Sequence, residues 1–342
     1  MEIAIDAMGG DFAPHNIVEG AIDAARKFRG IKRLYLVGLQ DTIERELQKY
    51  GDIPPQIEIY HATEVVEMDD PPVVAIRRKK DSSIIKAVEL VKTGKAQALF
   101  SAGNTGAAVA ATTLRLRTLQ GVERPAIATV IPTPKRPFIL IDAGANPDCS
   151  PALLVQFAVM GDVYSREILG VKNPSIGLLS IGGEEVKGNE TTKETFRILE
   201  SLPLNFCGNI EGSGLFEGQA DVVVCDGFSG NVVLKTSESV AKAMGKWLSQ
   251  EFTKNIFRTF GALLLKTALK NIKTKSNPDT YGGAPLLGVN GFCVIGHGSS
   301  SAEAVTNAIR VAHESVSHKV NHLIEEQLSG LQGLEKKENE KR

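Results

Sequence analysis

The chain lacks any strong net charge, because 39 Lys and Arg residues balance 40 Asp and Glu residues and leave −1 at pH 7. A protein that binds nucleic acid through its overall charge is therefore not expected. No apolar run approaches the roughly 18 residues of a membrane-spanning helix. The N-terminus, MEIAIDAMGG, has neither a basic start nor an apolar signal segment. We expect a cytoplasmic protein that at most lies peripherally on a membrane.

Cysteine is scarce and has no paired spacing. The four cysteines, Cys149, Cys207, Cys225 and Cys293, form no C-x-x-C motif, and three of them lie in or beside apolar segments. Disulfides or a metal site are the alternatives, but this pattern is typical of reduced core residues in a cytosolic protein. What the chain does have is length: 342 residues, 42% of them hydrophobic, can bury a large core.

Several catalytic fingerprints are also missing. The chain has no G-x-x-x-x-G-K-[ST] and no G-x-S-x-G, and the glycines of residues 212–218 miss G-x-G-x-x-G by one residue. These absences argue against a P-loop enzyme, a standard dinucleotide site and an α/β-hydrolase. His318 and His322 share a helix face without an apparent third ligand, so a solvated helix face is preferred over zinc. We predict no metal.

Short apolar segments alternate with longer helical patterns. Strands are expected at residues 2–6, 33–37, 57–61, 96–101, 126–131, 138–142, 176–181, 205–208, 222–226 and 292–295. Helices are expected at residues 14–29, 42–50, 83–93, 106–119, 151–169, 190–201, 230–249, 253–272 and 302–328. The alternation predicts an α/β fold with a mostly parallel sheet and helices on both faces.

The domain organisation follows from the same pattern. We expect one α/β domain over residues 1–329 and a charged flexible tail at 330–342. Residues 236–278 show no strand, so successive helices there would project as an arm. The arm carries Lys254, Arg258, Lys266 and Lys270 beside a broad apolar face. Such a helix suits an anionic membrane or an acidic partner, and a helix-pair or dimer contact is the alternative.

Six predicted strands end in glycine-rich polar turns, at residues 6–11, 101–106, 142–146, 182–189, 226–231 and 296–300. Ligands of open α/β sheets bind beyond the carboxyl ends of the strands, so we expect the six turns to form one polar cup. Glycine allows close backbone approach, and helix starts bind anions. Ordinary turn and cap chemistry is the alternative for any one turn.

The turns supply the candidate phosphate-binding residues. These are Gly9, Gly10, Asp11, Asn104, Thr105, Gly106, Asn146, Ser229 and Gly230. Lys187 adds a full positive charge in the segment SIGGEEVKGNE, between a strand and a helix, which favours phosphate as its ligand. Asp6, Asp142 and Asp226 are expected to brace the turns rather than to react.

These motifs, in this order, resemble those of the bacterial acyl-carrier-protein–phosphate acyltransferase family. The shared stretches are DAMGGD, SAGNTGA, GVERPA, DAGANPD, VQFAVMGDVYS, GEEVKGNE, ADVVVCDGFSGNVVLKT, YGGAPLLG and GHGSS, and they span nearly the whole chain. The resemblance implies a fold like that of phosphotransacetylase and of the isocitrate and isopropylmalate dehydrogenases. It also implies a homodimer without a metal or an organic cofactor.

The resemblance further implies a reaction. Acyl–acyl-carrier protein and inorganic phosphate would give acyl phosphate and free carrier protein, and a downstream acyltransferase would use the acyl phosphate in phospholipid synthesis. By position, the lysine and asparagine associated with catalysis in the family match Lys187 and Asn231. The family's arm is associated with membrane contact. His297 is a candidate acid for the leaving thiol, with a capping or structural role as the alternative.

Two other functions stay open at this stage. A hydroxy-acid dehydrogenase on the same fold type would need a nucleotide site, whose fingerprint is missing. A membrane-surface scaffold of lipid synthesis would need only the amphipathic arm, and would have no use for six polar glycine turns.

Overall fold

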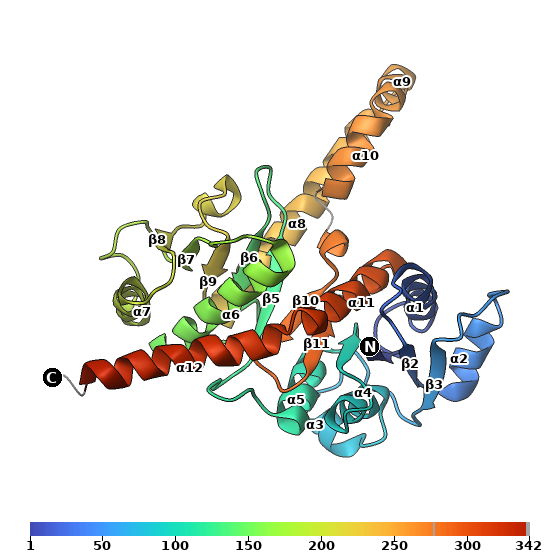
Figure 1. Ribbon diagram of the computed structural model, residues 1–342. Helices are drawn as coiled ribbons and strands as arrows, with labels where there is room; N and C mark the ends of the chain where they lie inside the picture. Colours follow the sequence, from blue (N-terminus) through green and yellow to red (C-terminus); the bar gives the residue numbers. More distant parts are fainter. Residues whose placement is uncertain (276–277, 340–342) are drawn as a thin grey trace.

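The computed structural model describes residues 1–275 and 278–339, and its body is a single mixed sheet covered by helices (Figure 1). The strands are β1 (Glu2–Asp6), β2 (Arg33–Gly38), β3 (Ile57–His61), β4 (Ala98–Ser101), β5 (Ala126–Ile131), β6 (Phe138–Ile141), β7 (Ile176–Leu179), β8 (Phe206–Ile210), β9 (Val222–Val224), β10 (Ala284–Leu287) and β11 (Phe292–Ile295). Their order across the sheet is β3-β2-β1-β4-β11-β10-β5-β6-β9-β7-β8.

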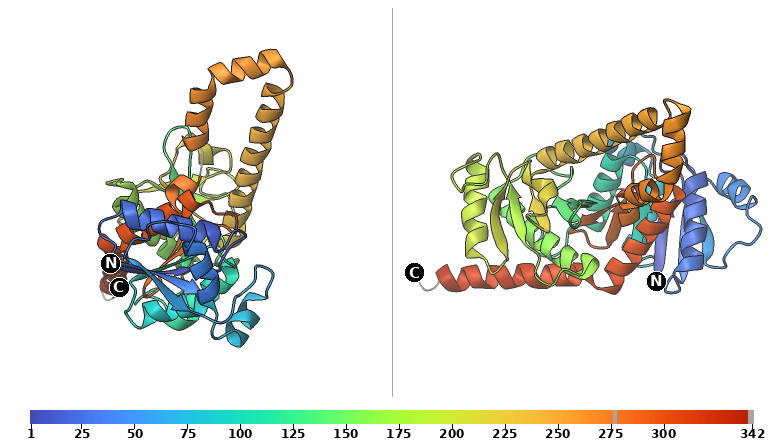
Figure 2. Two further views of the ribbon diagram at one scale, coloured as in Figure 1. Left: turned by 90° about the vertical axis from the view of Figure 1, so that its right-hand side faces the viewer. Right: turned by 90° about the horizontal axis from the view of Figure 1, so that it is seen from above.

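The helices of the body pack on both faces of this sheet, and those of the arm project from it (Figure 2). They are α1 (His15–Lys27), α2 (Gln40–Leu47), α3 (Pro72–Arg78), α4 (Ser83–Lys92), α5 (Thr105–Leu116), α6 (Pro151–Leu169), α7 (Glu190–Ser201), α8 (Gly227–Phe252), α9 (Ile256–Leu264), α10 (Lys266–Lys275), α11 (Ala302–Ser317) and α12 (Val320–Asn339), with short 3-10 turns η1 (Gly214–Glu217) and η2 (Pro278–Tyr281). None of the described helices combines the length and apolarity required to cross a bilayer.

Alternation along the strands divides the core between the two faces. In β1, Ile3 and Ile5 point to the face covered by α1, α6, α11 and α12, whereas Ala4 points to the face covered by α4 and α5. Successive side chains of a strand point to opposite faces, and both faces here are apolar and buried. The prediction of an α/β fold with a mostly parallel sheet is therefore confirmed.

Strand direction is what positions the functional turns. β10 runs antiparallel to both β11 and β5, and β5 runs antiparallel to β6. The parallel block β3-β2-β1-β4-β11 and the parallel block β6-β9-β7-β8 consequently point in opposite directions. The carboxyl ends of the two blocks lie at opposite edges of the sheet.

The helical arm leaves the body after β9. α8 has 26 residues, which makes it about 39 Å long, and it leads into α9 and α10. Figure 2 shows these three helices as an open frame that projects from the body. The sequence predicts a single helix over 253–272, but the chain turns at Leu265 and forms two.

Two other differences from the predicted elements concern the C-terminal helices. The expected helix 302–328 is divided between α11 and α12 at Lys319, whose φ of 56° is left-handed. No glycine or proline marks that break in the sequence. α12 then continues through Asn339, so the segment expected to be a flexible tail from residue 330 is helical as far as the structure describes it.

Candidate functional site

The six polar turns do not share one edge. The turns after β1, β4 and β11 follow one block of parallel strands, and the turns after β6, β7 and β9 follow the other, which points the opposite way. The expectation of a single six-turn cup is therefore wrong. We call the first group the β1–β4–β11 edge and the second group the β6–β9–β7 edge.

The turn after β6 is built around the buried carboxylate of Asp142. Its Oδ1 accepts hydrogen bonds from the backbone N–H groups of Ile127, Gly144 and Ala145 at 3.0–3.1 Å. Its Oδ2 accepts bonds from the backbone N–H and the side-chain amide of Asn146, at 2.6 and 2.9 Å. Burial raises the pKa of the Asp142 carboxyl, and these hydrogen bonds oppose that shift. Asp142 braces the turn, as expected.

Asn146 serves the same turn rather than a ligand. Its amide nitrogen donates to Asp142 Oδ2 and also to the carbonyl oxygen of Pro125 at 2.7 Å. Its side chain is buried. Because both amide hydrogens are used inside the protein, the structure does not support the prediction that Asn146 donates to phosphate.

The turn after β9 becomes the first turn of α8. Asp226 caps the helix by accepting the Ser229 N–H at 2.7 Å, and the Ser229 hydroxyl donates to the same carboxylate at 3.0 Å. Gly230 packs against the turn after β6 so closely that a Cβ there would lie 1.9 Å from the Asp142 carbonyl oxygen. This contact fixes the start of α8 against the Asp142 turn.

Asn231 is the next residue of α8 and is placed beside that turn. Its Cβ, Cγ and Oδ1 atoms lie 3.6–3.8 Å from where a Cβ of Gly144 would stand, which is ordinary van der Waals distance and shows that the Asn231 amide lies against the Asp142 turn. Asn231 is exposed, and its side chain has no hydrogen-bond partner among the described residues. Gly144 was not singled out as a site residue, although its DAGAN motif was visible in the sequence.

Lys187 stands at the same edge, in the loop after β7. β7 lies directly beside β9 and parallel to it, and β9 lies beside β6, so the three carboxyl ends are neighbours. The loop is held by a bond from the Lys187 N–H to the Glu184 carbonyl oxygen at 3.0 Å and by Asn209, whose amide donates to the same oxygen. The Lys187 side chain is exposed and makes no ion pair with any described residue. A free cation and a free amide thus stand at the ends of neighbouring strands.

The β1–β4–β11 edge is organised differently. The buried carboxylate of Asp6 accepts the Ser101 hydroxyl at 2.7 Å, and Ser101 Oγ in turn accepts the Gly103 N–H. Burial raises the pKa of the Asp6 carboxyl, and hydrogen bonds from serine side chains oppose the shift. A Cβ on Gly9 would lie 2.7 Å from the Gly103 nitrogen, so the two turns touch through their glycines.

The predicted donors of this edge are largely occupied. Asn104 caps α5 through its Oδ1, and its amide nitrogen donates to the carbonyl oxygens of Met68 and Asp70 at 3.1 and 3.0 Å. Thr105 and Gly106 are exposed in the first turn of α5, where Gly106 packs against Pro72. The Asn104 amide therefore ties a loop to α5.

Three more predicted residues belong to the β1–β4–β11 edge. Gly10, at a φ of 106°, lies next to the Gly298 carbonyl oxygen, which accepts the Asp11 N–H at 2.8 Å. His297 is exposed, and its Nδ1 contacts the Ser299 hydroxyl at 2.8 Å. The structure does not bring His297 to the edge that carries Lys187 and Asn231.

The four predicted contact cations of the arm differ in whether they have an ion-pair partner. Glu251 pairs with Lys254 at 3.2 Å and also with Arg258, whereas Lys266 and Lys270 have no ion-pair partner among the described residues. Beside them lies an exposed apolar groove of about 470 Å³, formed by α9 and α10. Within the described residues, no cluster of His, Cys, Asp or Glu is suited to a metal ion.

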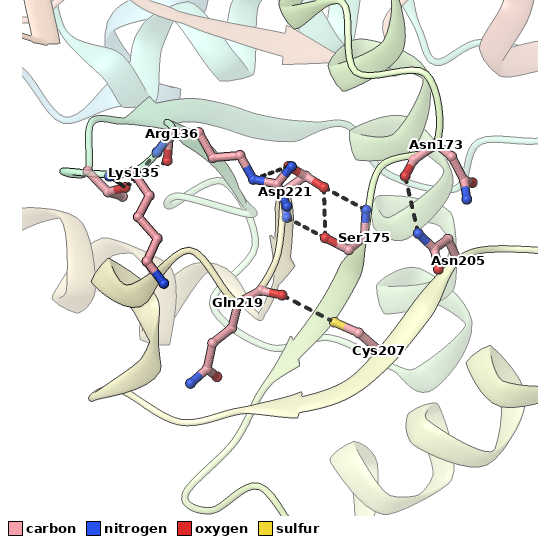
Figure 3. A network of polar contacts seen from close by, with 9 residues as sticks. Lys135, Arg136, Asn173, Ser175, Asn205, Cys207, Gln219 and Asp221 are labelled. Atoms are coloured by element: carbon pink, nitrogen blue, oxygen red, sulfur yellow. Dashed lines mark hydrogen bonds and ion pairs between the residues drawn. The ribbon is translucent and has the colours of Figure 1, made fainter.

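The amino ends of the β6-β9-β7 strands carry a network that the sequence did not reveal (Figure 3). Asp221, just before β9, is 2% exposed; it pairs with Arg136 Nε at 3.0 Å and accepts the hydroxyl and the N–H of Ser175. The three residues precede β9, β6 and β7, so the network ties the starts of three strands together. Its members are far apart in sequence and form no motif.

Comparison with solved structures tests the fold. A phosphotransacetylase from Streptococcus pyogenes superposes with a TM-score of 0.59 at 18% identity, covering 93% of this chain and 94% of that chain. A branched-chain phosphotransacylase from Enterococcus faecalis superposes with a TM-score of 0.55 at 16% identity, covering 92% and 99%. The predicted likeness to the phosphotransacetylase fold is confirmed.

The chain shares a much higher sequence identity with known proteins than with these solved structures. A family model described as "Fatty acid synthesis protein" matches residues 1–323. The chain is 50% identical over 337 residues to a phosphate acyltransferase of Pelotomaculum thermopropionicum, covering 98% of this chain and 97% of the relative. It is 49% identical over 328 residues to a phosphate acyltransferase of Geobacter sulfurreducens, covering 96% and 94%. As the resemblance of its motifs predicted, the chain belongs to the phosphate acyltransferase family.

Proposed function

We propose that this protein transfers a long-chain fatty acyl group from acyl–acyl-carrier protein to inorganic phosphate, giving acyl phosphate for phospholipid synthesis. The observation that carries the proposal is the pair Lys187 and Asn231, unpaired at neighbouring strand ends in a chain half identical to phosphate acyltransferases. The acyl phosphate would be consumed by a further acyltransferase. No cofactor is required for this chemistry.

Phosphate is already an anion, so the reaction needs its positioning and partial neutralisation rather than a strong base. Lys187 supplies a full positive charge, and the amide of Asn231 supplies a neutral donor at the start of α8. The N-terminal end of a long helix also favours an anion. We assign phosphate binding to these groups, with the Gly230 backbone and Ser229 beside them.

The thioester carbon is then attacked directly by a phosphate oxygen. The carbonyl oxygen becomes an oxyanion, which the same donors stabilise; one such donor contributes about 2.7–4 kcal/mol in other acyl transfers. The C–S bond breaks and the sulfur leaves as a thiolate, because a thiol has a pKa of about 8.5 and needs little acid help. His297, at the other edge, is not needed in this step.

The remaining predicted residues take supporting roles. Gly9, Gly10, Asp11 and the Asn104-Thr105-Gly106 turn shape the β1–β4–β11 edge, where we place no reacting phosphate oxygen. For the arm, the exposed apolar side chains of α9 with Lys266 and Lys270 suit contact with an anionic membrane surface. We expect the protein to act as a homodimer.

A trapping experiment tests the function. The protein is incubated with long-chain acyl–acyl-carrier protein with and without inorganic phosphate, and hydroxylamine is added under conditions that spare thioesters. We expect acyl hydroxamate and free carrier thiol only when phosphate is present. Thiol release without phosphate would indicate a thioesterase, and no release by folded protein would favour a non-catalytic role.

A further inference from the structure

A second surface of the molecule combines an apolar hollow with a cationic rim. It lies between α3, α4 and α5, and we call it the α3–α5 surface. The residues that line it are Ile76, Arg77, Lys80, Ile85, Ala111, Leu114 and Arg115. The hollow has a volume of about 270 Å³. It is an indentation on the face of the sheet opposite α1 and α11.

The floor of the hollow is part of the core. Ile76, Ile85 and Ala111 are buried members of the cluster that packs on this face of the sheet. Leu114, by contrast, is 63% exposed at the rim, and Val73 and Val74 are exposed on α3 nearby. Exposed apolar side chains that continue a buried apolar floor are typical of a site for an apolar anchor of another molecule.

The rim is positively charged in spite of the near-neutral chain. Residues 77–80 read Arg-Arg-Lys-Lys. Lys79 is neutralised by Asp70 at 2.5 Å, and Arg115 is neutralised by Glu89 at 2.6 Å. Arg77, Arg78 and Lys80 are exposed and make no ion pair with any residue that the structure describes. The rim therefore carries uncompensated positive charge beside the hollow.

The α3–α5 surface is rigidly joined to one group of glycine turns. The Asn104 amide holds the loop before α3 by bonds to the Met68 and Asp70 carbonyl oxygens. Gly106 packs against Pro72, the first residue of α3. A molecule bound on α3 is thus anchored beside the start of α5. The apolar cluster that holds Ile76, Ile85 and Ala111 also includes Ala143, and Ala145 of the Asp142 turn and Leu234 of α8 pack against it, so the surface is also connected to the β6–β9–β7 edge that carries the reacting pair.

We propose that the α3–α5 surface is the docking site of the acidic carrier protein that delivers the acyl thioester, an inference that rests on the proposed function. An apolar side chain of the carrier fills the hollow, and carboxylates around it face Arg77 and Lys80. Charge complementarity of this kind steers encounter and fixes orientation. The arm is the weaker candidate because Glu251 already pairs with two of its cations, Lys254 and Arg258.

The test is a binding measurement with fluorescently labelled acyl-carrier protein at low and at physiological ionic strength. Arg77→Glu with Lys80→Glu reverses two of the three free rim charges, those on the exposed side chains that line the hollow. We expect the dissociation constant to rise by about tenfold or more, and the salt dependence seen with the wild type to be lost. Leu114→Ser, which removes the exposed apolar rim, should weaken binding at both ionic strengths.

A matched control separates docking from net charge. Lys32→Glu with Lys172→Glu makes the same charge change at two exposed lysines outside the surface, and should bind carrier protein like the wild type. Thermal unfolding of each variant confirms that the fold is intact.

Three results would overturn the inference. One is an unchanged dissociation constant in the Arg77→Glu, Lys80→Glu variant, and another is an equal loss in the control. The third is a loss confined to Lys266→Glu with Lys270→Glu, which would move the carrier to the arm. A wild type that binds the carrier protein but forms no acyl phosphate would instead refute the proposed function and leave the docking surface standing.

Discussion

The two ends of the β6-β9-β7 strands differ in how their polar groups are satisfied. At the amino end, Asp221 is buried, its charge is paired with Arg136, and its Oδ2 accepts two hydrogen bonds from Ser175 (Figure 3). At the carboxyl end, Asp142 is equally well bound, but Lys187 and Asn231 stand beside it without partners among the described residues.

The difference indicates where a ligand is needed. A buried charge that is already paired inside the protein holds strands together and needs no ligand to neutralise it. An edge that combines a rigid, fully bonded turn with an unpaired cation and an unpaired amide is organised to bind something else. The carboxyl end is also where α/β sheets bind their ligands.

The largest effect is expected for Lys187→Ala. Loss of the only charge assigned to phosphate should lower kcat/KM about 100- to 1,000-fold, since one oxyanion donor contributes about 2.7–4 kcal/mol. Lys172→Ala removes an exposed lysine near the amino end of β7 and serves as the control. Initial rates of thiol release over a range of phosphate concentrations measure both. If the two variants lost kcat/KM equally, Lys187 at the carboxyl end would have no special role in phosphate binding.

Asn231→Ala should lower kcat/KM about 100-fold, because it removes a neutral donor of the same site. Asn231→Asp keeps the shape but adds a negative charge, so it should raise KM for phosphate further. The same rate assay distinguishes the two. If Asn231→Asp bound phosphate as tightly as Asn231→Ala, the side chain would not face the anion.

Gly230→Ala should lower both stability and activity, because it introduces a steric clash between the start of α8 and the Asp142 turn. The new Cβ would meet the Asp142 carbonyl oxygen, which cannot move without breaking the turn. Overpacking of this kind costs about 1–3 kcal/mol, and the shift of α8 should also reduce activity. Urea unfolding and the rate assay measure the two effects, and loss of stability with full activity would show that the start of α8 is not part of the site.

Asp221→Asn should affect only stability. It removes the ion pair with Arg136 while keeping a side chain of similar shape, and a lost charged hydrogen bond costs about 1–3 kcal/mol. Activity per folded molecule should be unchanged. Urea unfolding supplies the measurement, and a fall in kcat at a temperature where the variant is fully folded would contradict the structural role of the amino end.

Much of the fold could be predicted because its signals are local. Ten of the strands and most helices follow from apolar periods and turn residues, and the resemblance of ordered motifs predicted the family. The missed elements were short: α3 begins at the second proline of a Pro-Pro pair that indicates a loop, and β10 contains Pro285.

The directions of the strands were not predicted, and for this reason the six turns were wrongly expected at one edge of the sheet. β5 and β6 are joined by residues 132–137, a connection short enough that the two strands must be antiparallel neighbours. That hairpin and the missed β10 reverse the sheet, and so divide the six turns between two edges. Lys187 and Asn231 were found as single residues, and the bracing role of Asp142 was predicted because most of its partners lie in its own turn. The partners of Asp221 could not be predicted because they depend on which strands are neighbours.

The most direct test of the account is the position of phosphate in a crystal of the protein soaked with it. We predict phosphate density at the β6–β9–β7 edge, within hydrogen-bond distance of Lys187 Nζ and the Asn231 amide, and no such density when Lys187→Ala is soaked in the same way. Phosphate bound instead among Gly9, Gly10 and Gly103 at the β1–β4–β11 edge would contradict the account and transfer the reaction to the other edge of the sheet.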